Sequence, residues 1–346
     1  MAAEEMALEM SSARDELAGF DTCEHVQTDI GRVSVAVETE EEGMMMMMTA
    51  TEKKKKKKYK RKALPALMTL PDIGLGHESC FQALYLNAGA ASRLRSAFRT
   101  YHINPPGHAP DDAWTCDGTS REKNQTSDED AGPRPLRTDD LVKMVCTVMD
   151  ALGVRTAAFL GVGYGAHVLC KLTAMHPNRV TALILVNPTA GPPSWLDATI
   201  GELRIQSLWL RGTTPGAVEY FLARYFRREA RGVYGDYSSD MCRAAAEDLK
   251  RIDSRRLAAY AAACVRREPI AESWCRLIEC DTLVVVGDES VCKAESLAVN
   301  ENIPSPHATL VMLDKCGLLI TEEQPQRLLS PIELFIQGLV QRGIAG

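Results

Sequence analysis

The sequence predicts an α/β fold, in which a mostly parallel sheet is flanked by helices and a helical cap is inserted between two strands. Three observations lead to this prediction. From about residue 138 onward, short apolar segments alternate with amphipathic segments, as in a chain of βα units. One of these strands, Thr156–Leu160, runs directly into a glycine-rich turn and a helix. Residues 190–275 are mostly helical without strand alternation, which predicts a cap over the carboxyl ends of the strands.

The individual elements follow from apolar runs and from turn and capping residues. Two segments on either side of Ile30-Gly31-Arg32 predict a β-hairpin. The predicted strands are Cys23–Thr28, Val33–Val37, Leu64–Leu70, Phe98–Ile103, Thr156–Leu160, Thr181–Val186, Leu283–Val286 and Thr309–Leu313. The predicted helices are Thr138–Leu152, Ala166–Met175, Glu295–Asn300 and Leu328–Gln341. The sequence Thr138-Asp139-Asp140 is expected to cap the first of these helices.

Two stretches interrupt this pattern, and both are predicted to be loops. Residues at about 39–62 form a low-complexity tract of acidic residues, methionines and lysines that cannot bury a core. Residues at about 109–137 are polar and rich in Asp and Gly. Residues 1–20 are expected to be a flexible tail, so that the folded domain spans 21–346.

The charge of the chain is unevenly distributed. The 346 residues carry a formal net charge of −6, yet Lys53–Lys62 contains nine positive charges, so the rest of the chain is strongly acidic. An acidic body argues against a sequence-specific nucleic-acid-binding surface. The lysine run leaves three interpretations open: a solvated loop, a patch that contacts anionic membranes, or a nuclear-import signal.

The cysteines and the start of the chain bear on the compartment. The eleven cysteines are scattered without a CxxC pair, and the chain opens with the acidic sequence MAAEEMALEM. This pattern predicts neither a disulfide framework nor a metal site, and it favours a reducing, cytoplasmic setting. No apolar run approaches the roughly 18–20 residues that span a bilayer.

The glycine-rich turn GVGYG has two interpretations. Gly161, Gly163 and Ala166 fit the G-x-G-x-x-A fingerprint of dinucleotide-binding folds. That fingerprint requires an acidic residue at the end of the next strand to hold the ribose. The next strand here ends in Val186-Asn187-Pro188, without a carboxylate. No cofactor is therefore predicted.

The second interpretation is a nucleophile elbow, G-x-S-x-G, in which the serine is replaced by Gly163. A hydrolase of this type also needs an acid after a later strand and a histidine near the end of the chain. The acid position falls in Gly287-Asp288-Glu289-Ser290 and is held by Ser290. The histidine position falls in KCGLLITEEQP and is held by Leu318. The sequence thus predicts an α/β-hydrolase fold with a degenerate triad and no catalytic residue.

Several motifs together carry a family resemblance from about residue 22 to 342. They are CEHVQTDIGRVSVAV, LPDIGLGHESCF, GVGYGAHVLCKLTAMHPNRVTALILVNP, PSWLD, ARYFRREARG, LVVVGDES and CGLLITEEQP. In this order they resemble the N-myc downstream-regulated (NDRG) family, non-catalytic members of the α/β-hydrolase superfamily, and most of all its plant branch. The resemblance implies a role in signalling, stress response or growth. For the plant branch it further implies association with heterotrimeric G-protein βγ subunits.

Two groups of residues are candidates for binding. His77, His108 and Tyr164 are expected to line the pocket under the cap, although a local structural role is the alternative for each. The segment LARYFRREARGVY concentrates the residue types enriched in binding hot spots. Its candidate partner-binding residues are Arg224, Tyr225, Arg227 and Arg228, with an ordinary packed helix as the alternative.

These observations favour a non-enzymatic scaffold or adaptor. The competing hypothesis is an atypical hydrolase or a small-ligand receptor that uses the pocket under the cap. The two differ in what the pocket should contain, because a receptor or enzyme needs converging polar groups whereas a scaffold can fill the space with apolar side chains.

Overall fold

The computed structural model describes residues 20–38, 64–108, 135–191, 195–233, 236–237, 239–270, 272–304 and 306–345. Eight strands form one sheet in the order β1-β2-β4-β3-β5-β6-β9-β10. Their bounds are Phe20–Thr28, Gly31–Glu38, Arg99–Asn104, Ala66–Leu70, Ala157–Val162, Val180–Val186, Asp281–Gly287 and Ala308–Leu313, in that spatial order. The low-complexity tract and most of the polar loop predicted from the sequence lie outside the described residues.

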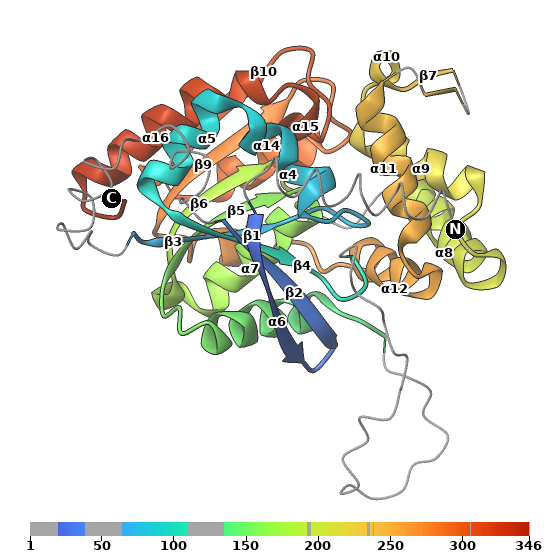
Figure 1. Ribbon diagram of the computed structural model, residues 1–346, viewed down its shortest axis with the longest axis horizontal. Coiled ribbons are helices and arrows are strands. Elements are labelled where there is room, and N and C mark those ends of the chain that lie inside the picture. Colours follow the sequence, from blue (N-terminus) through green and yellow to red (C-terminus); the bar gives the residue numbers. More distant parts are fainter. Residues whose placement is uncertain are drawn as a thin grey trace, which may run out of the picture.

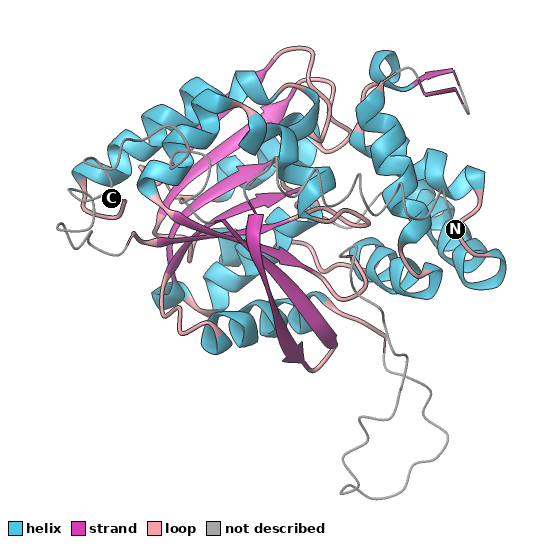
Figure 2. Cartoon of the chain, in the orientation of Figure 1, coloured by secondary structure: helices cyan, strands magenta, loops and turns pink. Residues whose placement is uncertain are grey.

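The sheet is mostly parallel, as predicted. β1 and β2 form the antiparallel hairpin, and β2 pairs antiparallel with β4. Every later pair in the order, from β4–β3 to β9–β10, is parallel. All six residues of β5 are buried, because helices cover both faces of the sheet (Figure 2). The carboxyl ends of the parallel strands consequently meet at one edge, where binding sites of such sheets usually form.

Helices cover the two faces of the sheet in two groups. α6 (Thr138–Ala151) and α7 (Tyr164–Met175) contact each other on the lower face in Figure 1. α5 (Ala88–Ala97) and α16 (Leu329–Gln341) contact each other on the upper face. The other helices of this core are α4 (His77–Leu86), α14 (Lys293–Asn302) and α15 (Ile320–Glu323).

Three details differ from the elements derived from the sequence. α4 and α5 occupy a stretch for which no element is predicted. α6 is capped one residue earlier than predicted: the Asp140 carboxylate accepts the N–H of Arg137 at 2.9 Å. The hydroxyl of Thr138 instead bonds the hydroxyl of Tyr164 at 3.0 Å. In the segment predicted to lack strands, Gly232–Val233 (β7) and Asp236–Tyr237 (β8) form a small ribbon.

Residues 195–275 lie between β6 and β9, and we call them the cap. Its helices are α8 (Trp195–Arg211), α9 (Pro215–Tyr225), α10 (Arg228–Arg231), α11 (Asp240–Arg251), α12 (Ser254–Val265) and α13 (Glu272–Cys275). Tyr225 fastens the cap to the core, because its hydroxyl donates to the carbonyl of Ile73 and its carbonyl accepts the N–H of Leu319. The cap therefore sits on the loops that follow β3 and β10, at the right of Figure 1.

No helix in the described part of the chain is long and apolar enough to cross a membrane.

Candidate functional site at the glycine turn

The glycine turn has the backbone of a nucleophile elbow. Gly163 connects β5 directly to α7 with φ 57° and ψ −116°, a conformation that side chains with a Cβ rarely adopt. Its N–H donates to the carbonyl of Val186 at 3.0 Å, which anchors the turn to the neighbouring strand. The strand, turn and helix predicted from the sequence are therefore present, with glycine at the position that a nucleophile would need.

A second glycine brings another loop against this turn. A Cβ on Gly165 would lie 2.5 Å from the carbonyl oxygen of Pro71, so only glycine permits this close approach. Pro71 belongs to the loop that follows β3, and the close packing places the next residue, Asp72, over the elbow.

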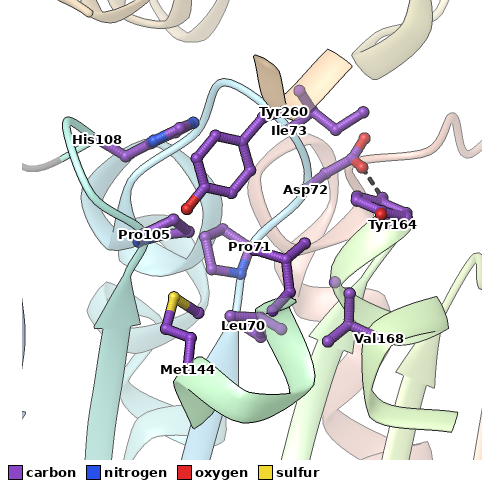
Figure 3. A pocket seen from close by; sticks show the side chains of 12 residues that line it. Leu70, Pro71, Asp72, Ile73, Pro105, His108, Met144, Tyr164, Val168 and Tyr260 are labelled. Atoms are coloured by element: carbon purple, nitrogen blue, oxygen red, sulfur yellow. Dashed lines mark hydrogen bonds between the residues drawn. The ribbon is translucent and has the colours of Figure 1, made fainter. Parts of the chain in front are cut away.

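The Asp72 carboxylate fills the space that a nucleophilic side chain would occupy. A Cβ built on Gly163 would lie 2.5 Å from Cγ of Asp72. Oδ1 of Asp72 accepts the N–H of Tyr164 at 2.8 Å (Figure 3). In α/β-hydrolases the amide that follows the nucleophile is one of the two donors of the oxyanion hole. Here that donor is already bound to an anion of the chain itself.

The charge of Asp72 is balanced by a residue of the cap. Arg224, in the last turn of α9, places Nε 2.8 Å from Oδ2 and Nη2 3.2 Å from Oδ1. The Asp72 side chain is fully buried, and that of Arg224 is 18% exposed. Burial alone would lower the pKa of the Arg224 guanidinium, but the Asp72 charge outweighs this and holds the pKa well above its ordinary value. The carboxylate and the guanidinium thus form an ion pair that links the core to the cap.

The loops with the predicted acid and histidine positions, Ser290 and Leu318, follow β9 and β10. Ser290 is buried, and its Oγ accepts the N–H of Cys292 at 3.2 Å. Leu318 is buried in the core. Both loops are fastened by Asn187, whose Nδ2 donates to the Leu318 carbonyl at 2.8 Å and whose Oδ1 accepts the N–H of Gly287 at 2.9 Å. Asn187 itself has a positive φ of 47°.

The histidines near the site are held neutral. Nε2 of His108 accepts the N–H of Gly74 at 3.3 Å, and Nδ1 contacts the Pro106 carbonyl at 3.3 Å. Burial lowers the pKa of His108 to about 4. Burial likewise lowers the pKa of His77 to about 4, and its imidazole bonds Asn104 and stacks on a neighbouring histidine. Burial thus favours the uncharged form of both rings.

One cavity beneath the cap, lined by described residues, is small and mainly apolar. Its volume of about 20 Å³ is close to what a single water molecule requires. Of the three predicted lining residues, His108 and Tyr164 border it, whereas His77 does not (Figure 3). The residues that line the cavity come mostly from the loop after β3 and from α6 and α7, among them Pro71, Met144 and Val168.

The candidate partner-binding residues are mostly engaged inside the molecule. Tyr225 is completely buried, and Arg224 is paired with Asp72, so neither is presented on the surface, and their predicted role in partner binding stays a prediction. Arg227 pairs with the nearly buried carboxylate of Glu323 at 2.7 Å. Only Arg228 of the four is exposed. The physical reason is that the chain passes along the core at the end of α9, where Arg224 and the following Arg227 each meet a carboxylate.

Sequence reasoning did not find the role of Asp72. The motif LPDIGLG shows that an aspartate follows a strand at the binding edge of the sheet, which was a usable signal. Its partner Arg224 lies 152 positions further along the chain, so the pair itself is visible only after folding. The described residues contain no group of His, Cys, Asp and Glu that could hold a metal ion.

The sheet order and the elbow define a protein of the α/β-hydrolase fold, and solved structures agree. A hydrolase from Pseudomonas aeruginosa matches with a TM-score of 0.67 at 20% identity, covering 91% of this chain and 98% of that one. The enol-lactonase from Burkholderia xenovorans matches with a TM-score of 0.67 at 16% identity, covering 91% and 100%. At such low identity these matches establish the fold alone.

Within that fold, the chain belongs to the Ndr family, whose model matches residues 24–341. It is 32% identical to Protein NDL1 of Arabidopsis thaliana over 81% of this chain and 77% of that protein. It is also 32% identical to the pollen-specific protein SF21 of Helianthus annuus, over 79% and 74%. Protein NDRG3 of Xenopus tropicalis is 26% identical over 80% and 67%. The family predicted from the sequence motifs is confirmed.

Proposed function

We propose that this protein is a non-enzymatic scaffold or adaptor of the NDRG type, acting in growth, stress or G-protein-linked signalling. One observation carries the proposal: the Asp72–Arg224 ion pair occupies the catalytic position and binds the oxyanion-hole amide of Tyr164. A substrate carbonyl cannot reach an amide that is 2.8 Å from a buried carboxylate. Family membership supports the same general role, because the curated relatives carry protein names and not enzyme names.

The contents of the cavity weigh against an esterase or a small-ligand receptor. An active pocket needs several hundred Å³ and a few converging polar groups. Here the space holds about one water, and the nearby His108 has both ring nitrogens in hydrogen-bonding contacts. This alternative would require the cap to move and the Asp72–Arg224 pair to separate.

A scaffold needs an exposed binding surface, and we propose that α8 provides it. The inner side of α8 packs Ile205 and Leu208 into the cap, whereas Leu203 and Leu210 on the outer side are 61% and 84% exposed. Ile200 and Trp209 are exposed on the same helix. Exposed apolar groups gathered on one element are typical of interaction sites. Arg204 and Arg211 are exposed beside this apolar stripe and suit an acidic partner surface.

The first test is a search for catalytic activity. Purified protein is incubated with short p-nitrophenyl esters, and hydrolysis is compared with a control of buffer plus albumin. We expect no turnover above that control. Steady turnover that disappears in the Asp288→Asn or His108→Gln variant would support the atypical hydrolase instead.

The second test addresses the partner. The resemblance to the plant branch makes G-protein βγ subunits the probe of choice, and binding is measured with purified proteins. Leu203→Glu combined with Leu210→Glu should reduce binding at least tenfold. Leu334→Glu with Val340→Glu on α16 makes the same change in charge at exposed apolar positions outside the cap and serves as the matched control. Equal loss in both double variants would contradict an interface on α8.

For the location of the protein we propose the cytoplasm, with peripheral contact to anionic membranes through Lys53–Lys62. These residues lie outside the described part of the chain, so the proposal rests on their charge alone. Each lysine near such a surface contributes about 1 kcal/mol at most, and salt screens it. Deleting 53–62 should weaken binding to phosphatidylserine vesicles at low salt. Unchanged binding would remove the membrane role and leave the solvated loop or nuclear-import signal.

A further inference from the structure

Three N–H groups from two different parts of the chain converge on the Asp72 carboxylate. Tyr164 contributes its backbone N–H at 2.8 Å, and Arg224 contributes Nε at 2.8 Å and Nη2 at 3.2 Å. Tyr164 is also the first residue of α7, a helix of 12 residues, so the amide end of the helix dipole adds a favourable field. We call these three donors the carboxylate cradle.

The geometry of the cradle favours a carboxylate over a chloride ion. The guanidinium binds the two carboxylate oxygens through two separate nitrogens, the fork arrangement that matches a planar, two-oxygen acceptor. The helix amide then adds a bond to one of the same two oxygens. A chloride ion offers one centre and cannot satisfy all three donors at these positions.

The cradle and the carboxylate bound in it join three separate parts of the fold. Asp72 comes from the loop after β3, Tyr164 from the elbow, and Arg224 from the cap. Tyr225 and Ile73, which follow Arg224 and Asp72 in the sequence, form a second contact between the cap and the core, because the Tyr225 hydroxyl donates to the Ile73 carbonyl. Removing the carboxylate would leave the guanidinium at the cap–core boundary without its counter-charge.

We propose that the former oxyanion hole has become a carboxylate-binding site whose resident ligand is the chain's own Asp72, and that its occupancy holds the cap on the core. The site has kept its capacity to bind an anion while its catalytic use is gone. A small monocarboxylate from solution should therefore enter the cradle once the Asp72 side chain is removed.

Formate rescue of the full-length Asp72→Gly variant tests this proposal. Thermal unfolding is measured in sodium formate and in sodium chloride at equal ionic strength. Formate at about ten times its dissociation constant should raise the melting temperature of the variant by roughly 2–4 °C over chloride, and the effect should saturate. Asp72→Asn still fills the cradle and, like the wild type, should show no difference between the two salts.

Two further measurements distinguish binding in the cradle from a general salt effect. The double variant Asp72→Gly with Arg224→Leu has lost the fork, so formate should no longer differ from chloride. Amide hydrogen exchange in α9 should be faster in Asp72→Gly than in wild type, and formate should slow it again. If Asp72→Gly does not fold in chloride, the yield of refolded protein in formate and in chloride becomes the readout.

The proposal is overturned if formate and chloride act alike on Asp72→Gly, in melting temperature or in refolding. It is equally overturned if the double variant responds to formate as the single variant does. Formate rescue without any change in the exchange of α9 would refute the second half of the proposal, that the cradle holds the cap. Because no step of this test involves a partner or a substrate, its result is independent of the scaffold function.

Discussion

The inner and outer sides of the cap use opposite kinds of residue. Where α9 meets the core, Arg224 and Arg227 pair with Asp72 and Glu323, and both carboxylates are almost completely buried. On the outer side of α8, the large apolar residues Leu203 and Leu210 are exposed. The usual arrangement, with charges outside and apolar groups inside, is reversed at these two places.

The difference shows that residue type alone does not predict which arginines and aromatic residues of the cap are exposed. Arginines and aromatics are enriched in binding hot spots, and the segment around Arg224 is rich in both. In this molecule residues of these types contact the core instead, since Arg224 pairs with Asp72 and the Tyr225 hydroxyl donates to the Ile73 carbonyl. The exposed apolar residues of α8, Leu203 and Leu210, are the ones on which the proposed binding surface rests.

The largest expected effect comes from breaking the inner ion pair. Arg224→Leu leaves the Asp72 carboxylate buried without a counter-charge, which should lower the free energy of unfolding by about 3–5 kcal/mol. Asp72→Asn added to Arg224→Leu removes the unpaired charge, so the double variant should be more stable than Arg224→Leu alone. Urea unfolding of the two variants and the wild type measures this. A double variant no more stable than the single one would mean that the pair contributes through packing instead.

A smaller loss is expected from restoring the serine of the elbow. Gly163→Ser introduces a Cβ that would lie 2.5 Å from the Asp72 carboxylate, at a φ of 57°. Strain and overpacking together should lower stability by about 2–4 kcal/mol. No esterase activity should appear, because position 318 supplies no base. The combination with Asp72→Gly should recover part of the lost stability, and a failure to recover it would assign the whole loss to backbone strain.

The fold was predictable because its signals are local. The alternation of apolar strands and helices, the GVGYG turn and the loops at Ser290 and Leu318 are each contained within a short stretch of sequence. The site was only half predictable. The residues at the predicted triad positions can be seen position by position, but the pairing of Asp72 with Arg224 depends on a contact across 152 positions. Nothing in the periodicity of either segment specifies that contact.

The same limit applies to Asn187 and Glu323. In the sequence, Asn187 was informative only because it stands where a dinucleotide-binding fold would have a carboxylate. In the structure its side chain bonds the loops at Gly287 and Leu318. Glu323 accepts the N–H of Gly317 at 2.9 Å while pairing with Arg227. Both residues act on loops that converge only when the sheet has formed, so their roles depend on topology.

Two neighbouring arginines allow a paired and an exposed charge to be compared within one segment. Arg227→Glu breaks the pair with the buried Glu323 carboxylate and places a like charge beside it, which should lower stability by about 1–3 kcal/mol. Arg228→Glu makes the same change of charge at an exposed position and should stay within about 0.5 kcal/mol of wild type. Thermal unfolding of the two single variants measures the stability loss at each position. Equal losses at both positions would show that net charge, and not the pairing with Glu323, sets the stability of this segment.

The smallest effect on stability is expected on the outer side of α8. Leu210 is 84% exposed and Leu203 is 61% exposed, so replacing both with glutamate removes little buried area. The melting temperature should stay within about 1–2 °C of the wild-type value, because surface substitutions usually change stability by no more than about 0.5 kcal/mol each. Leu208→Ala, on the inner side of the same helix, removes a side chain that is 1% exposed and should lower stability by about 2–4 kcal/mol. A marked loss of stability in the Leu203 and Leu210 variant would mean that these leucines support the fold, and the proposed binding surface would then have to lie elsewhere on the cap.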